Sequence, residues 1–161
     1  MVSDSEKRQW FVLGMRYVKA STVAAAFRPM GVECFVPPVV TNLLFVHDTR
    51  KRIDEYLAYS EMGQKLYLLR DKASWQAIVV RDKDMDIFMT ACKAQEAPII
   101  MTESPKVKLG DKVRVTEGDW KGVEGYVVRL KKQKRVLINV SNVLWAATAY
   151  IRPEQLEVIN E

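Results

Sequence analysis

The chain has 161 residues, a length that fits one ordinary domain or two small ones. Hydrophobic residues make up 48% and charged residues 28%, which is typical of a folded protein and excludes a disordered chain. The formal net charge is +5, with most of the excess in residues 106–161, where 11 Lys plus Arg face 7 Asp plus Glu. Such a mild excess permits contact with nucleic acid without requiring it.

Several classes of protein are disfavoured by what the sequence lacks. The polar N-terminus leads into an apolar run too short for a signal peptide, and no uncharged apolar stretch approaches the ~18 residues of a membrane span, so we expect a cytoplasmic protein without membrane contact. Cys34 and Cys92 lie among apolar residues, which favours buried thiols over a disulfide between them. Because His47 is the sole histidine and no phosphate-binding glycine loop precedes a helix, we expect no metal, no cofactor and no enzymatic activity.

The first hundred residues alternate strand and helix patterns. Apolar residues recur at helical spacing after possible caps, as in Met85, Phe88 and Cys92 after Asp82, while the intervening runs are β-branched and aromatic. The order predicts an open sheet with helices packed on it. We expect strands at 10–17, 32–36, 39–46, 66–69 and 77–80, and helices capped by Ser21 or Thr22, by Asp48 or Thr49, and by Asp82.

The character of the chain changes near residue 100. Residues 96–105 break every periodicity and contain two prolines, so they predict a linker between a domain of residues 1–95 and a domain of residues 106–161. The second domain shows short strands separated by turn residues, which is typical of a small β-barrel. Its β-branched residues and glycines also disfavour a helical form. The expected strands are 112–116, 125–130, 136–140, 146–151 and 156–159.

Residues 110–127 combine alternating valines with glycines that mark a tight turn. We expect Gly118 and Gly122 to take positive φ, Gly125 to relieve crowding where a strand bends, and Trp120 to fold over the turn. The spacing resembles the KOW motif, which occurs both in ribosomal proteins and in transcription factors. The residues that carry this resemblance are Gly110, Val113, Val115, Gly118, Trp120, Gly122 and Gly125.

The N-terminal half resembles the polymerase-binding domain of the NusG family of transcription elongation and antitermination factors. The resemblance lies in residues 10–13, 31–37, 44–46 and 79–88, and with the KOW motif it covers roughly residues 9–159. It implies an α+β protein: an N-terminal α/β sandwich-like domain with an antiparallel sheet, followed by a small KOW (SH3-like) β-barrel. The short first half looks closer to specialised antiterminators, such as RfaH and those of Bacteroides capsule-type operons, than to the housekeeping factor.

The resemblance implies that the first domain binds the clamp helices of the large RNA polymerase subunit. Leu43 and Phe45, on one face of their strand, and Gly14 are the contact residues it points to, with an exposed apolar patch as the expected sign. Leu44 and Val46, on the other face of that strand, are expected to face the core. Burial of both faces of that strand is the alternative, and Trp10 is expected in the core. Gly14 and Leu43 depart from relatives, which place a tyrosine and an aromatic residue there, and only residues 37–42 remain of a hairpin that faces DNA in relatives.

The second domain offers two further candidate contact surfaces. Lys131, Lys132, Lys134 and Arg135 form a basic hairpin tip that could touch DNA, RNA, the ribosome or an acidic protein, or could be a solvated turn. Leu144 and Trp145 lie where relatives contact a small-subunit ribosomal protein or a termination factor. A monomer is expected. The alternative function is a ribosome- or RNA-binding KOW protein that does not associate with polymerase.

Overall fold

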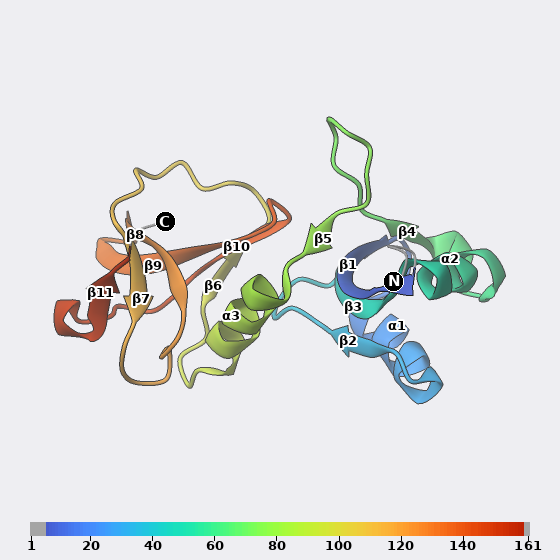
Figure 1. Ribbon diagram of the computed structural model, residues 1–161, viewed down its shortest axis with the longest axis horizontal. Helices are drawn as coiled ribbons and strands as arrows, with labels where there is room; N and C mark the ends of the chain where they lie inside the picture. The colour runs from blue at the N-terminus through green and yellow to red at the C-terminus, as the bar shows by residue number, and fades with distance from the viewer. Residues whose placement is uncertain (1–5, 160–161) are drawn as a thin grey trace. The chain divides into compact units, whose positions relative to one another are not determined.

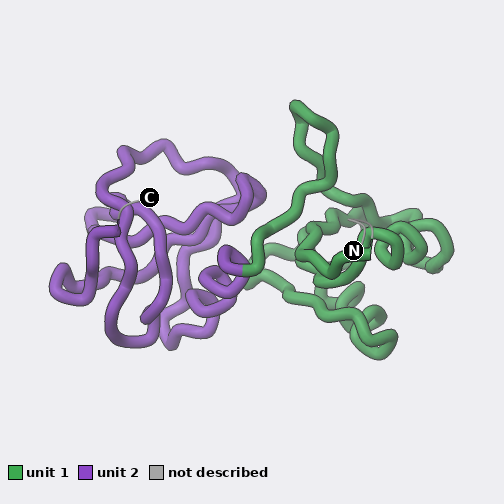
Figure 2. Tube along the Cα trace, in the orientation of Figure 1, with its two compact units in different colours: residues 1–82 green, residues 83–161 purple. Residues whose placement is uncertain are grey.

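The computed structural model describes residues 6–159, and the chain forms two compact units that divide after Asp82. Figure 2 colours them separately, and we call the described residues before and after this division the first unit and the second unit. Helices and antiparallel sheets together make up the chain, which confirms the predicted α+β class.

The first unit is built on a five-stranded antiparallel sheet (Figure 1). Strand β1 lies at its centre, with β3 along one edge and with β4 and β5 sharing the other edge, while β2 pairs with the far side of β3. The strands are β1 (Arg8–Met15), β2 (Glu33–Phe35), β3 (Leu43–Thr49), β4 (Leu66–Leu68) and β5 (Val79–Val80).

One face of this sheet forms the core of the first unit with helices α1 (Ala20–Phe27) and α2 (Arg50–Tyr59). Side chains alternate across a strand, so every second residue of β1 and β3 points to this core. Leu44 and Val46 are among these residues, which confirms the prediction that they face the core. The principal members of the core are Phe11, Leu13, Val23, Phe27, Leu44, Val46 and Ile53.

Local hydrogen bonds explain where the helices begin and end. Thr49 caps α2, because its Oγ1 accepts a hydrogen bond at 3.1 Å from the backbone N–H three residues later. Helix α1 begins after Lys19 without a side-chain cap, so the prediction of a cap at Ser21 or Thr22 is wrong, and both lie inside the helix. Gly31 closes the 3-10 turn Arg28–Met30 with a φ of 80°, where a residue without a side chain avoids strain.

The second unit carries helix α3 (Asp82–Lys93), whose first residue lies at the division, and a six-stranded antiparallel sheet in the order β11-β7-β8-β9-β10-β6. Among the described residues no ladder joins β11 to β6, so the structure shows an open strand order, and closure into a barrel stays a prediction. The strands are β6 (Ile99–Met101), β7 (Lys112–Val115), β8 (Glu124–Leu130), β9 (Gln133–Val140), β10 (Leu144–Ala147) and β11 (Leu156–Val158).

Residues 96–105, predicted as a linker, are not free of secondary structure. Ile99 to Met101 form β6, which pairs with β10, and the contact-based division of the chain falls earlier, after Asp82. The apolar triplet between the two prolines pairs with a strand edge that local sequence does not reveal. Whether residues 1–95 and 106–161 fold separately stays a prediction.

Candidate partner-binding surfaces

Leu43 and Phe45 lie on the sheet face opposite the α1 and α2 core. Phe45 pairs with Val12 of β1 and Phe35 of β2, and its ring centroid lies 6.5 Å from that of Phe35. The exposed fraction is 9% for Leu43 and 0% for Phe45, so the exposed apolar patch expected there is absent. Burial of both strand faces, the alternative to contact, agrees with the continuous apolar run of β3.

Gly14, a predicted contact residue, lies beside Leu43, a second predicted contact residue. It pairs with Leu43 on one side and with Tyr67 of β4 on the other, so these three residues form a row across three strands. A Cβ atom at Gly14 would overlap the Tyr67 ring. Tyr67 is 45% exposed, and its ring centroid lies 5.8 Å from the Arg16 guanidinium carbon. The missing side chain at Gly14 therefore makes room for an exposed aromatic ring from the neighbouring strand, which we did not predict.

A second row on the same face joins Trp10, His47 and Glu33. The rings of Trp10 and His47 stack with centroids 4.9 Å apart, and His47 Nδ1 lies 2.9 Å from Glu33 Oε1. Trp10 is 4% exposed and so belongs to the interior, as predicted. The sole histidine thus has a packing and hydrogen-bonding role, and it lies in no group of metal-ligating residues within positions 6–159.

The loop between β4 and β5 presents an exposed tryptophan that we did not predict from the sequence. Figure 1 shows this loop standing away from the sheet of the first unit, and Trp75 in it is 68% exposed with a φ of 59°. The Arg70 guanidinium carbon lies 5.9 Å from the Trp75 ring centroid and the group donates to the Trp75 carbonyl. The local sequence does not reveal whether a side chain is exposed. The available sign of an exposed tryptophan was an apolar residue in a polar loop.

Asp71 organises that loop. Its Oδ1 accepts hydrogen bonds from the backbone N–H groups of Ala73 and Ser74, each at 2.9 Å, and from the Ser74 hydroxyl. The bonds from Ser74 N–H and then Ala73 N–H stabilise the carboxylate, which lowers the pKa of Asp71 below its ordinary value of 3.8. The exposed tryptophan is therefore carried by a hydrogen-bonded loop.

In the second unit the KOW-like turn has the geometry that its glycines predict. Gly118 and Gly122 have φ values of 84° and 93°, and a Cβ at Gly125 would overlap the Leu137 carbonyl on β9. Trp120 is 9% exposed in the turn between β7 and β8. Gly110 lies where the chain approaches β8, since its N–H donates to the Val127 carbonyl at 2.7 Å. The strand valines Val113 and Val115 are buried.

The predicted basic tip is the two-residue turn of the β8–β9 hairpin. Lys131 and Lys132 have φ values of 53° and 65°, as a type I′ turn requires but a lysine rarely adopts. Lys134 is exposed, whereas the Arg135 guanidinium donates to the Leu130 and Thr148 carbonyls. Three lysines thus project freely, while Arg135 is fixed to the sheet.

Leu144 and Trp145 differ in accessibility. Leu144 is fully buried on β10, so its side chain offers a partner no surface. Trp145 is half-buried, pairs with Met101 of β6 and packs beside the core residues Val128, Leu137 and Ala147. Of this pair, Trp145 alone keeps surface for a contact.

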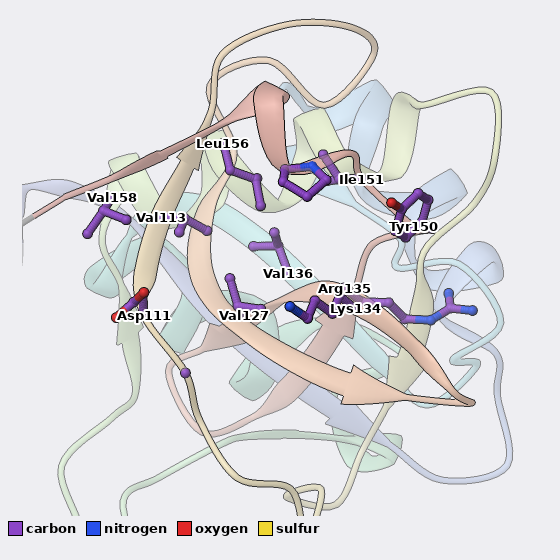
Figure 3. A pocket seen from close by; sticks show the side chains of 12 residues that line it. Asp111, Val113, Val127, Lys134, Arg135, Val136, Tyr150, Ile151, Leu156 and Val158 are labelled. Carbon is purple, nitrogen blue, oxygen red and sulfur yellow. The ribbon is translucent and has the colours of Figure 1, made fainter.

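A groove of about 690 Å³ opens on the second unit. Figure 3 shows aliphatic side chains pointing into it, with Lys134 and Arg135 at one side, Tyr150 close to them and Asp111 at another edge. Its lining comes from the start of β7 and the residues just before it, the middle of β8, the start of β9, the segment after β10 and the last described strand, so residues distant in sequence build it. No local motif predicts such a groove.

The two cysteines are free thiols. Burial raises the pKa of Cys34 to about 11 and that of Cys92 to about 12, so both stay protonated at neutral pH. Both residues are only half-buried, so the prediction of free thiols among apolar residues agrees with the structure, whereas full burial does not. Within the described residues no helix is long and apolar enough to cross a membrane.

Comparison with known proteins gives a likeness in fold. No family model matches the sequence, and no curated protein matches it. Chains of solved structures do match, among them a structure of NusG from Thermotoga maritima described by its domain interaction. The TM-score is 0.50 at 13% sequence identity, over 96% of this chain and 98% of the NusG chain. The chain therefore has a NusG-like fold.

Proposed function

We propose that the protein is a non-catalytic transcription elongation and antitermination factor that binds RNA polymerase through residues 1–95 and recruits a partner through a KOW domain of residues 106–161. The observation that carries the proposal is the NusG-like fold over nearly the whole chain. The KOW-like turn supports it, because Gly118 and Gly122 take the positive φ values that this spacing predicts.

The polymerase contact is proposed on the row that joins Leu43, Gly14 and Tyr67. Leu43 and Gly14 are buried and lie directly side by side, and Tyr67, which is 45% exposed, is the accessible side chain of the row. Tyrosine and arginine are the residue types that most often dominate protein interfaces, and Arg16 lies over this ring. Phe45 is 0% exposed, so in this proposal it supports the row as an interior residue and does not touch polymerase itself.

The proposed partner of the second unit is a small-subunit ribosomal protein or a termination factor. Trp145 and the lysines at the β8–β9 turn are the accessible members of the predicted contact set. If the first unit binds polymerase and the second unit binds this partner, the protein would link the polymerase to the ribosome or to a termination factor. The same lysines could also touch DNA or RNA through their charge.

The test measures binding of the purified full-length protein to core RNA polymerase by biolayer interferometry. Tyr67→Ala should weaken binding by about 1–3 kcal/mol, the range for an interface aromatic. Tyr59→Ala is the matched control, because Tyr59 is 85% exposed and lies on helix α2. Equal affinities for both variants would reject the row as the contact, and absence of binding by the unaltered protein would reject the proposed function.

A further inference from the structure

The groove of the second unit has an aliphatic interior and a charged rim. Val113, Val136 and Ile151 form a buried floor, while Val158 is 63% exposed at the side. Figure 3 shows Val113, Val136 and Ile151 around one space, with Val158 at its outer edge. These residues come from β7, from β9, from the segment after β10, and from β11. An accessible hollow with such walls removes apolar surface of a ligand from water, which is the main source of affinity in such contacts.

The cationic side of this rim is already ordered. The Arg135 guanidinium donates to the Leu130 carbonyl at 3.1 Å, the Thr148 carbonyl at 3.1 Å and Gln133 Oε1 at 2.8 Å. Within residues 6–159 neither Arg135 nor the exposed Lys134 pairs with a carboxylate. An anionic group that binds here gains a fixed cation without the entropic cost of ordering it.

More positive charge lies next to the groove. Lys108, Arg129 and Lys134 line an adjoining hollow, which shares Gly110 and Val127 with the groove. On the opposite end of β8, Glu124 is engaged by Lys83 at 3.0 Å and by Arg114 at 3.6 Å. The described lining of the groove and the adjoining hollow thus carries Lys108, Arg129, Lys134 and Arg135 against one carboxylate, that of Asp111, so positive charge is in excess there and the ligand that complements it is acidic.

The lining selects a peptide over a nucleic acid. Sites for single-stranded nucleic acid stack several bases on aromatic rings, yet Tyr150 is the one aromatic residue among those that line the groove. Aliphatic walls fit aliphatic side chains instead. Tyr150 is 51% exposed, so its hydroxyl can meet a polar backbone group at the rim.

We propose that this groove binds an acidic peptide segment, with an aliphatic side chain seated against Val127 and Val136 and its flanking carboxylates on Lys134 and Arg135. The inference deepens the proposed recruitment of a partner by the second unit, since it names the surface and the chemistry of the partner. It does not depend on polymerase binding, and its test contains no polymerase.

The test measures fluorescence anisotropy of a short fluorescein-labelled peptide in which glutamates flank leucines, titrated with the full-length protein. Peptides with serine in place of leucine, or lysine in place of glutamate, are the ligand controls. Lys134→Glu and Val158→Asp should each weaken binding by about tenfold, because one reverses the rim charge and the other puts a charge in the apolar wall. Lys121→Glu is the matched control, as it makes the same charge change at the exposed β7–β8 turn.

The proposal holds if the leucine–glutamate peptide binds, both control peptides bind weakly, and the losses occur at Lys134 and Val158 but not at Lys121. Equal binding of the serine peptide would show a charge effect without the groove and would overturn it. A uridine-rich RNA that displaces the peptide and binds more tightly would assign the surface to nucleic acid. No binding of the leucine–glutamate peptide would also overturn the proposal, with the polymerase test left unaffected.

Discussion

Gly14 and Tyr67 lie directly opposite each other on neighbouring antiparallel strands, and the Tyr67 ring occupies the space that a side chain at Gly14 would fill. Gly14 has Leu43 as its partner on the other side, so the glycine joins a half-exposed ring to an apolar strand. A glycine in a strand interior commonly marks such a close approach.

Gly14→Ala is expected to displace the Tyr67 ring at a small cost in stability. The new methyl group would meet the outer atoms of a flexible side chain and no backbone, so the ring can swing outward. We expect a loss of about 1 kcal/mol in the free energy of unfolding, measured by urea denaturation, together with weaker polymerase binding. A large loss of stability with unchanged binding would show that the glycine serves packing alone.

Phe45→Ala is expected to destabilise the protein. Phe45 is fully buried between Val12 and Phe35 on the neighbouring strands, so truncation leaves a cavity that costs about 3–5 kcal/mol. Thermal and urea unfolding of the variant check this. A near-native free energy of unfolding would mean that exposure of Phe45 to water costs little, which would restore it as a candidate for direct contact with polymerase.

The sequence was sufficient to predict the features that depend on a residue's own backbone preference. Thr49 caps α2, and Gly118 and Gly122 take positive φ, because each follows from the residue type and its immediate neighbours. The alternation of β3 likewise predicted that Leu44 faces the core.

The sequence could not predict the features that depend on pairing between strands distant in the chain. Strand β6 lies in an apparent linker, so it exists only because the distant strand β10 offers an edge. The candidate groove likewise joins Asp111 of one segment to Tyr150 of another. The apolar run of β3 could not say whether Phe45 is exposed, since burial is a property of the assembled chain.

The Trp75 loop is expected to loosen in acid. The pKa of Asp71 is lowered in the folded chain, so its hydrogen bonds stabilise the loop at pH values above the ordinary 3.8, and this contribution is lost as pH falls through the lower folded pKa. Protection of the Ala73 and Ser74 amides against hydrogen exchange, measured by NMR relative to the intrinsic exchange rate at each pH, should fall selectively in that window. Asp71→Asn should remove the pH dependence, and an unchanged profile in this variant would exclude Asp71 as its origin.

Replacement of the Lys131–Lys132 turn by Asn-Gly is expected to stabilise the second unit. Both lysines have positive φ, which costs an ordinary residue about 1–2 kcal/mol and costs glycine little. The midpoint of urea unfolding should rise in the double variant but not in Lys121→Asn, which removes a charge from a residue without positive φ. If the midpoint does not rise, the turn is unstrained and its lysines need no functional explanation.

Affinity purification of the tagged full-length protein from its own cells, under gentle lysis with nuclease, tests the central claim most directly. The account predicts that the subunits of core RNA polymerase are recovered together, in amounts reduced by Tyr67→Ala and unchanged by Tyr59→Ala. Recovery of ribosomal subunits without polymerase would contradict it and would favour a ribosome- or RNA-binding KOW protein instead.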